Sequence, residues 1–259
     1  MTPAPVSPDT RVVVIGLGYV GLPLAVALAR HFDTVGLDID EGRIAELTEQ
    51  HHDRTGEIDA GTLAASTLKL IARAEDCPPA DVYIVTVPTP VDADNVPDLR
   101  LVRAASRMVG GMIAPDRSPI VVFESTVYPG VTEDICGPLI AEVSGLTRGR
   151  DFFLGYSPER INPGDREHTV DRITKVVAGE NPEVTATLYA LYGAVTSGGC
   201  FAASSIAVAE AAKVIENAQR DINIAFMNEI ARIFARLNIS VWDVLAARTK
   251  WNFLKFQPA

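Results

Sequence analysis

A glycine-rich hexapeptide gives the clearest sign of chemistry in this sequence of 259 residues. It reads Gly16-Leu17-Gly18-Tyr19-Val20-Gly21, follows the β-branched run at 12–15 and precedes a helix expected at 22–31. Gly16 permits a tight bend, Gly18 lets the backbone approach a pyrophosphate, and Gly21 allows the helix to pack closely on the strand. The amides at the start of the helix would bind the phosphates. The hexapeptide therefore predicts a dinucleotide site.

Asp38 indicates which dinucleotide binds. It ends a second expected strand about 20 residues after the glycines, where an acidic side chain accepts hydrogen bonds from a ribose diol and repels a 2′-phosphate. NAD is therefore favoured over NADP as the cofactor. Arg43 is nearby in the sequence and is the group that could accommodate the extra phosphate, so we place it among the cofactor-binding candidates too.

A polar stripe is expected on a long helix near the end of the chain. Glu210, Lys213, Asn217 and Arg220 follow one another at spacings of three and four residues, which places them on one helix face. Such a stripe can be a solvated surface or part of a site, and spacing alone favours the solvated surface. A second polar face at 216, 219 and 223 competes for the same interpretation.

Composition excludes several classes of protein. The formal charge of −10 argues against broad attraction to nucleic acid. No apolar run approaches the roughly 18 residues of a membrane-spanning helix, so no membrane partner is expected. The cysteines Cys77, Cys136 and Cys200 form no disulfide or metal pattern. The default expectation is a cytoplasmic protein.

The pattern of elements predicts an α/β fold with a Rossmann-like, doubly wound and mostly parallel sheet. Short apolar runs alternate with helical or polar segments, as in such sheets; the runs lie at 12–15, 34–37, 82–87, 120–123 and 152–154. A helix near 185–192 and a long one from Ile206 to about Leu237 follow, then another at 241–247. We expect a disordered leader at 1–10, a dinucleotide-binding domain at 11–203, and at 204–259 a long connecting helix with the start of a helical dimerisation domain.

The extended turn Gly-Leu-Gly-Tyr-Val-Gly-Leu-Pro resembles that of the UDP-glucose/GDP-mannose dehydrogenase family. Further motifs resemble the family in the same order: Val87-Pro88-Thr89-Pro90, Glu124-Ser125-Thr126-Val127-Tyr128-Pro129-Gly130, Tyr156-Ser157-Pro158-Glu159-Arg160-Ile161-Asn162-Pro163-Gly164 and Ala209-Glu210-Ala211-Ala212-Lys213-Val214-Ile215-Glu216-Asn217. The resemblance covers nearly the whole chain after the leader. The Ser-Pro-Glu-Arg form is most similar to the branch that oxidises UDP-N-acetylhexosamines, above all UDP-N-acetylglucosamine, for polysaccharide synthesis.

The resemblance implies oxidation of C6 of a nucleotide sugar to a carboxylate, with two hydrides passed to NAD and a cysteine thioester as intermediate. Thr89 and Thr126 would line the nicotinamide site, and Thr126 could also position a catalytic water. Glu159 would take a proton from the attacking water. Lys213 would stabilise negative charge on the C6 oxygen with support from Asn217. These side chains are therefore candidates for substrate binding as well, together with Arg160, which could face the acetamido or phosphate groups.

The sequence departs from the family at two functional positions. One is Pro163, where UDP-glucose-specific members resemble one another in carrying a further glutamate, and the other is the nucleophile. The family's nucleophilic cysteine would follow soon after Pro258, beyond Ala259, and the UDP-binding domain is also missing. We expect Cys77, Cys136 and Cys200 to be structural. Three hypotheses follow. The chain is the N-terminal and central part of a UDP-N-acetylhexosamine 6-dehydrogenase without its nucleophile, or it is a non-catalytic NAD-binding and dimerisation fragment. The third, less favoured by the motifs, is a 3-hydroxyacid dehydrogenase that uses Lys213 and Asn217.

Overall fold

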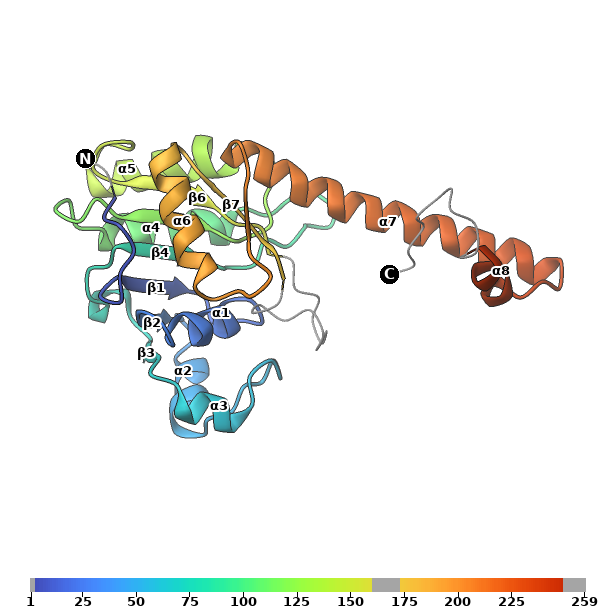
Figure 1. Cartoon of the computed structure of the whole chain (residues 1–259), viewed down its shortest axis with the longest axis horizontal. Helices are drawn as coiled ribbons and strands as arrows, with labels where there is room; N and C mark the ends of the chain where they lie inside the picture. Colours follow the sequence, from blue (N-terminus) through green and yellow to red (C-terminus); the bar gives the residue numbers. More distant parts are fainter. Residues whose placement is uncertain (1–2, 160–172, 249–259) are drawn as a thin grey trace. The chain divides into compact units, whose positions relative to one another are not determined.

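The computed structural model describes residues 3–159 and 173–248. Figure 1 shows a sheet with helices on both of its faces. The strands are β1 (Arg11–Ile15), β2 (Asp33–Leu37), β3 (Lys69–Ile71), β4 (Val82–Val85), β5 (Ile120–Phe123), β6 (Phe153–Tyr156), β7 (Lys175–Gly179) and β8 (Cys200–Ala202). The helices are α1 (Gly21–Leu28), α2 (Glu41–Glu49), α3 (Ala60–Ala65), α4 (Arg100–Met112), α5 (Gly137–Ser144), α6 (Pro182–Gly193), α7 (Ile206–Arg236) and α8 (Val241–Arg248). A 3₁₀ turn, η1 (Ala74–Asp76), and a π-helical segment, η2 (Val131–Cys136), complete the elements.

The strand order confirms the predicted Rossmann-like sheet. The order is β3-β2-β1-β4-β5-β6-β7-β8, and the first six strands are parallel. The order reverses between β1 and β4, the place where open α/β sheets bind ligands beyond the carboxyl ends of their strands. β7 returns antiparallel to β6, and β8 is parallel to β7. The apolar runs did not predict β3 and β8, because each has only three residues and an incompletely buried face.

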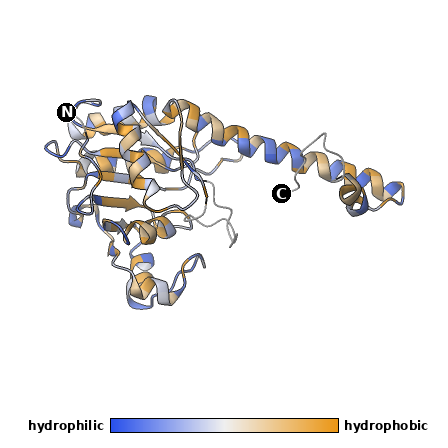
Figure 2. Cartoon of the chain, viewed as in Figure 1, coloured by the Kyte–Doolittle hydropathy of each residue, from blue (hydrophilic) through white to orange (hydrophobic). Residues whose placement is uncertain are grey.

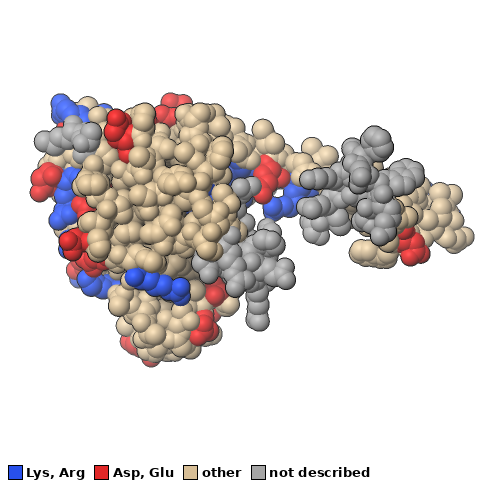
Figure 3. Space-filling view, viewed as in Figure 1, with Lys and Arg blue, Asp and Glu red and all other residues tan. Residues whose placement is uncertain are grey.

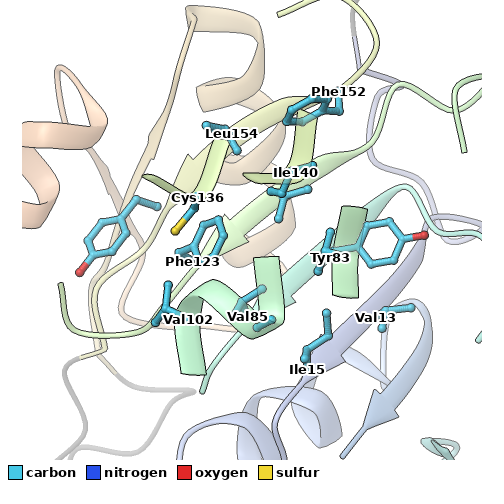
Figure 4. Close-up of a cluster of buried hydrophobic side chains, with 14 of the residues drawn as sticks. Val13, Ile15, Tyr83, Val85, Val102, Phe123, Cys136, Ile140, Phe152 and Leu154 are labelled. Carbon is cyan, nitrogen blue, oxygen red and sulfur yellow. The ribbon is translucent and has the colours of Figure 1, made fainter. Parts of the chain in front are cut away.

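The side chains of the central strands alternate between two apolar cores. Val13, Tyr83 and Phe123 lie in one core, which α4 and α5 complete and which Figure 4 shows in close-up. Val12, Ile84 and Val122 lie in the other, which includes side chains of α1 and α6. Burial on both faces explains why these strands read as continuous apolar runs, which appear as hydrophobic ribbons in Figure 2.

The N-terminal segment at 3–10, part of the predicted leader, packs against the core that includes α1. Val6 packs against the core on the α1 side, and Thr10 is buried. The Ser7 amide donates to Thr10 Oγ1 at 2.8 Å, and the Thr10 amide donates to the Ser7 carbonyl at 2.9 Å. Residues 1 and 2 lie outside the described part of the chain.

The chain divides into two compact units within α7, Met1–Ala211 and Ala212–Ala259. The long helix ends at Arg236, one residue before its predicted end, and α8 matches the helix expected at 241–247. In the second unit Ile215, Ile222 and Ile233 are exposed on α7. Within the described ranges no helix combines the length and apolarity needed to cross a membrane.

In the view of Figure 3 the charged side chains of the first unit lie mainly along its left and lower margins, where groups of both signs occur. The surface over α6 carries few charges in this view, and the helix contains one charged residue, Glu183.

Candidate functional site

The glycine turn after β1 depends on conformations that only glycine adopts easily. Gly16 has a φ of +92°, and its amide donates to the Leu37 carbonyl at 2.8 Å. A Cβ at Gly21 would lie 1.9 Å from the Gly16 carbonyl oxygen and 2.4 Å from Thr86 Oγ1. The first and last glycines of the hexapeptide are therefore required by the backbone itself.

Thr86, directly after β4, fixes the turn from the neighbouring strand. Its hydroxyl donates to the Gly16 carbonyl at 2.7 Å and lies 3.0 Å from the Ile15 carbonyl oxygen. The sequence analysis did not single out this residue. Its position in the sequence could have indicated it, because Thr86 directly follows a buried strand. That strand, β4, lies next to β1, where the strand order reverses.

Asp38, the predicted ribose-binding residue, contacts the glycine turn. Its Oδ2 accepts a hydrogen bond from the Leu17 amide at 2.7 Å, and its Oδ1 accepts one from the Asp40 amide at 3.0 Å. The carboxylate therefore joins the end of β2 to the second residue of the hexapeptide. This is the place where an acidic side chain can accept hydrogen bonds from a ribose.

Arg43 lies beneath the turn and is almost fully buried. Its Nε donates to the Leu17 carbonyl at 3.0 Å, and Nη2 contacts Asp53 Oδ1 at 2.5 Å. Burial opposes charge on Asp53, but hydrogen bonds from Arg43 and Thr55 outweigh it and lower the pKa of that carboxyl. The guanidinium therefore holds the backbone of the turn through the Leu17 carbonyl, whereas the sequence suggested only a group that could accommodate a 2′-phosphate.

The glycine turn is open to a ligand at its second glycine. No atom lies within 4 Å of a Cβ built on Gly18, so the backbone there is open to close approach. Tyr19 is exposed, and Val20, the N-cap residue of α1, makes no side-chain capping hydrogen bond, whereas Asp40 caps α2 and Asn181 caps α6. The Leu22 amide donates to the Gly18 carbonyl at 3.1 Å. No side chain caps the start of α1, and a pyrophosphate is the ligand that such a helix start favours.

Thr89 and Thr126, predicted to share a site, lie in contact. Thr89 Oγ1 donates to the Thr126 carbonyl at 2.6 Å and so joins the loops that follow β4 and β5. Ser125 Oγ donates to the Val87 carbonyl at 2.5 Å and strengthens the same connection. The Thr126 side chain is exposed at this edge of the sheet.

Behind these loops is a buried group of ionisable side chains, Glu124, Glu159, Lys175 and Tyr192, which we call the Lys175 cluster. Lys175 Nζ lies 2.7 Å from Glu124 Oε2 and 3.8 Å from Glu159 Oε2. The Tyr192 hydroxyl donates to Glu124 Oε1, and the Lys175 ammonium lies 5.2 Å from the centre of the Tyr192 ring. Sequence reasoning found Glu159 but assigned no role to the other three.

Burial and charge act in opposite directions in the Lys175 cluster. Burial raises the pKa of Glu124, and Lys175 opposes that rise. Burial also disfavours the charged form of Lys175, but Glu124 and Glu159 outweigh it and raise the pKa of the ammonium. Lys175 is therefore a cation at neutral pH, held between two carboxyl groups.

The predicted polar stripe divides between the two compact units. Glu210 belongs to the first, where its carboxylate accepts hydrogen bonds from the amides of Gly130 at 2.7 Å and Thr132 at 3.0 Å. Burial raises the pKa of Glu210, while the Thr132 and Gly130 donors oppose the rise. Lys213 and Asn217 belong to the second unit, one turn apart on α7. Arg160 and Pro163 lie outside the described residues.

The three cysteines are unpaired and poorly suited to nucleophilic chemistry. Burial raises the pKa of Cys77 and of Cys136 to about 11. Burial also raises the pKa of Cys200, although Lys175 opposes it. Cys136 is part of the apolar core in Figure 4. A thiol is a weak nucleophile when little thiolate is present at neutral pH.

Comparison with protein families gives two matches in this chain. Residues 10–196 match the NAD binding domain of the UDP-glucose/GDP-mannose dehydrogenase family, and residues 207–258 match its central domain. The two matches follow the order of the motifs along the sequence.

Curated relatives and solved structures agree with these matches. A UDP-N-acetyl-D-glucosamine 6-dehydrogenase from Pseudomonas aeruginosa is 52% identical over 252 residues, covering 96% of this chain and 59% of the relative. Protein CapL from Staphylococcus aureus is also 52% identical, with 96% and 58% covered. The structure of a UDP-D-ManNAc dehydrogenase from Pyrococcus horikoshii aligns with a TM-score of 0.86 at 31% identity, covering 96% of this chain and 59% of that one. The chain thus spans somewhat more than half the length of these relatives.

Proposed function

Because the chain belongs to the UDP-glucose/GDP-mannose dehydrogenase family, we propose that it is the NAD-binding and central portion of an enzyme that oxidises C6 of a UDP-N-acetylhexosamine. The observation that carries the substrate class is the 52% identity to a relative named UDP-N-acetyl-D-glucosamine 6-dehydrogenase. UDP-N-acetylglucosamine is therefore the first substrate to test. Its product would be a uronic acid for polysaccharide synthesis.

The cofactor end of this proposal rests on the glycine turn. Gly16, Gly18 and Gly21, with Tyr19 and Val20, would hold the pyrophosphate at the start of α1. Asp38 would accept the hydroxyl groups of the adenosine ribose. Arg43 would act by fixing the Leu17 carbonyl. NAD, when bound, accepts the hydride.

The proposed chemistry rests on six side chains. Thr89 and Thr126 would line the nicotinamide end, since their loops meet where the strand order reverses. Glu159 would take a proton from water. Lys213 would stabilise negative charge on the C6 oxygen, and Asn217, one turn away on α7, would assist it by hydrogen bonding. Arg160, next to Glu159 in the sequence, is assigned to substrate phosphate or acetamido groups.

We also propose that the chain forms a homodimer through α7. Ile215, Ile222 and Ile233 are exposed on this helix, and their burial against a second copy would remove apolar surface from water. Sedimentation of the chain should give twice the mass of 27.8 kDa, and a monomer at micromolar concentration would contradict the proposal. The unpaired cysteines are compatible with a reducing cytoplasm, which is the compartment we propose.

A second function is favoured by one observation. Burial raises the pKa of all three cysteines, and that of Cys77 and of Cys136 to about 11. On this ground the chain by itself would be a non-catalytic NAD-binding and dimerisation module. Such a module would bind NAD without forming NADH in the presence of UDP-sugars.

One experiment separates the two functions. The chain is mixed with NAD and either UDP-N-acetylglucosamine or UDP-glucose, and NADH absorbance is followed. The same assay is applied to a chimera that continues after residue 259 with the remaining part of the Pseudomonas aeruginosa relative. We expect the chimera to form NADH with UDP-N-acetylglucosamine. If both proteins bind NAD but neither forms NADH, the enzymatic function is contradicted and the non-catalytic module is supported. In the chimera, Lys213→Ala should lower the rate by at least about 100-fold with little change in NAD affinity.

A further inference from the structure

The antiparallel return of β7 brings a lysine beside the carboxylate that we propose as the base. Gly155 is paired with Gly179 and Tyr156 with Ala178. Continuing this register past the end of β6 places Lys175 opposite Glu159. Lys175 Nζ accordingly lies 3.8 Å from Glu159 Oε2, and both side chains are buried.

Two other side chains fix the position of Lys175. Glu124, directly after β5, accepts a hydrogen bond from Lys175 Nζ at 2.7 Å, and the Tyr192 hydroxyl from α6 donates a hydrogen bond to the other oxygen of Glu124. Residues from β7, from the loop after β5 and from α6 thus form one buried hydrogen-bonded group. In such surroundings a charge interaction is stronger than it is at the surface.

We propose that Lys175 is a positioning residue that holds the Glu159 carboxylate in place by charge attraction, and that Glu124 and Tyr192 hold Lys175 for this task. The proposal rests on the function assigned to Glu159 above. A base must be unprotonated before it can accept a proton, and an adjacent cation favours that form. Glu124 acts in the opposite direction, because its negative charge offsets part of the lysine charge that reaches Glu159.

Three titratable groups of the described residues interact electrostatically with Glu159: Glu124 after β5, Lys175 on β7 and Tyr192 on α6. A fourth group, Cys200 on β8, interacts with Lys175. Lys175 is the positive group among these four. Its removal and the removal of Glu124 must therefore move the protonation of Glu159 in opposite directions.

A carbon-13 NMR titration measures these two shifts directly. The chain is labelled at the glutamate carboxyl carbons, and Glu159→Gln and Glu124→Gln each identify one resonance by its loss. Lys175→Met should raise the pKa of Glu159 by about one unit or more, and Glu124→Gln should lower it. Lys69→Met, which removes an exposed lysine paired with Asp33 on the same sheet, is the control and should leave Glu159 unchanged.

An unchanged Glu159 titration in folded Lys175→Met would overturn the proposal. If that variant does not fold, Glu124→Gln decides: a lower pKa of Glu159 supports the proposal, and an equal or higher one refutes it. A lysine that served packing alone would not produce opposite shifts. The titration needs neither substrate nor turnover, so a chimera that forms no NADH would contradict the proposed function without altering this result.

Discussion

The glycine turn and the Lys175 cluster both lie at carboxyl ends of strands, but they are held together by different forces. The turn is organised by backbone groups, with Asp38 and Thr86 as side-chain supports. The Lys175 cluster is organised by charged side chains removed from water. This turn has no room for an added atom at Gly21, whereas a buried charge cluster tolerates no missing partner. Substitutions should therefore damage the two regions in different ways.

Gly21→Ala is expected to have the largest effect. The new Cβ would lie 1.9 Å from the Gly16 carbonyl oxygen, so the turn must deform or the helix must move away. We expect no measurable NAD binding by calorimetry and a stability loss of about 4 kcal/mol or more.

Gly18→Ala is the matched control, since nothing lies within 4 Å of its added Cβ. It should leave thermal stability nearly unchanged while weakening NAD binding. Equal NAD affinity in the two alanine variants would contradict the assignment of separate tasks to these glycines.

Lys175→Met should have the next largest effect, and that effect should depend on pH. Removing the cation leaves Glu124 and Glu159 without their buried partner, at a cost of about 3–5 kcal/mol at neutral pH. Glu124 already has a pKa raised by burial above its ordinary 4.5, and without Lys175 the folded protein would bind that proton more tightly still. Stability should then fall as pH rises above 4.5 through the folded-state pKa.

Urea denaturation at several pH values measures this loss. Lys69→Met should cost less than about 1 kcal/mol, because its ion pair with Asp33 is exposed. A loss in Lys175→Met that is independent of pH would show that the charge of Lys175 is not what stabilises the cluster.

Asp38→Ala should have an intermediate effect confined to the turn. It removes the acceptor of the Leu17 and Asp40 amides and the group proposed to bind the ribose. We expect NAD affinity to fall by about 10- to 100-fold, equivalent to about 1.5–3 kcal/mol. Isothermal titration with NAD and with NADP tests both affinity and preference; an unchanged NAD affinity would remove Asp38 from the site.

Thr89→Val should have the smallest effect. It removes one hydrogen bond to the Thr126 carbonyl at an exposed edge, which is worth about 0.5–1 kcal/mol. NAD affinity should change by no more than about fivefold. A loss as great as that of Asp38→Ala would mean that Thr89 binds the cofactor more strongly than its present contact indicates.

The same contrast explains what the sequence could predict. The glycine turn was predictable because its strand, bend and helix are consecutive, and each glycine answers a local steric demand. Asp38 followed from its distance along the chain. The sheet was predictable because strands buried on both faces are continuously apolar.

The Lys175 cluster was not predictable on these grounds. Glu124 and Lys175 are 51 positions apart, and Lys175 reads only as a polar residue at the start of an apolar run. Its position beside Glu159 depends on the antiparallel return of β7, which a mostly parallel pattern does not indicate. The burial of Arg43 was missed for a similar reason, because its partner Asp53 lies in a loop without a pattern of its own.

Glu210 has a consequence for experiments that isolate the first unit. Its carboxylate occupies the Gly130 and Thr132 amides at the start of η2, although it belongs to α7. A fragment cut at residue 203, where the sequence suggests a division, would leave these two amides without their acceptor. A fragment that continues to Ala211 retains it. A fragment that contains the nucleotide-binding part alone should therefore include Glu210, although this residue belongs to the connecting helix.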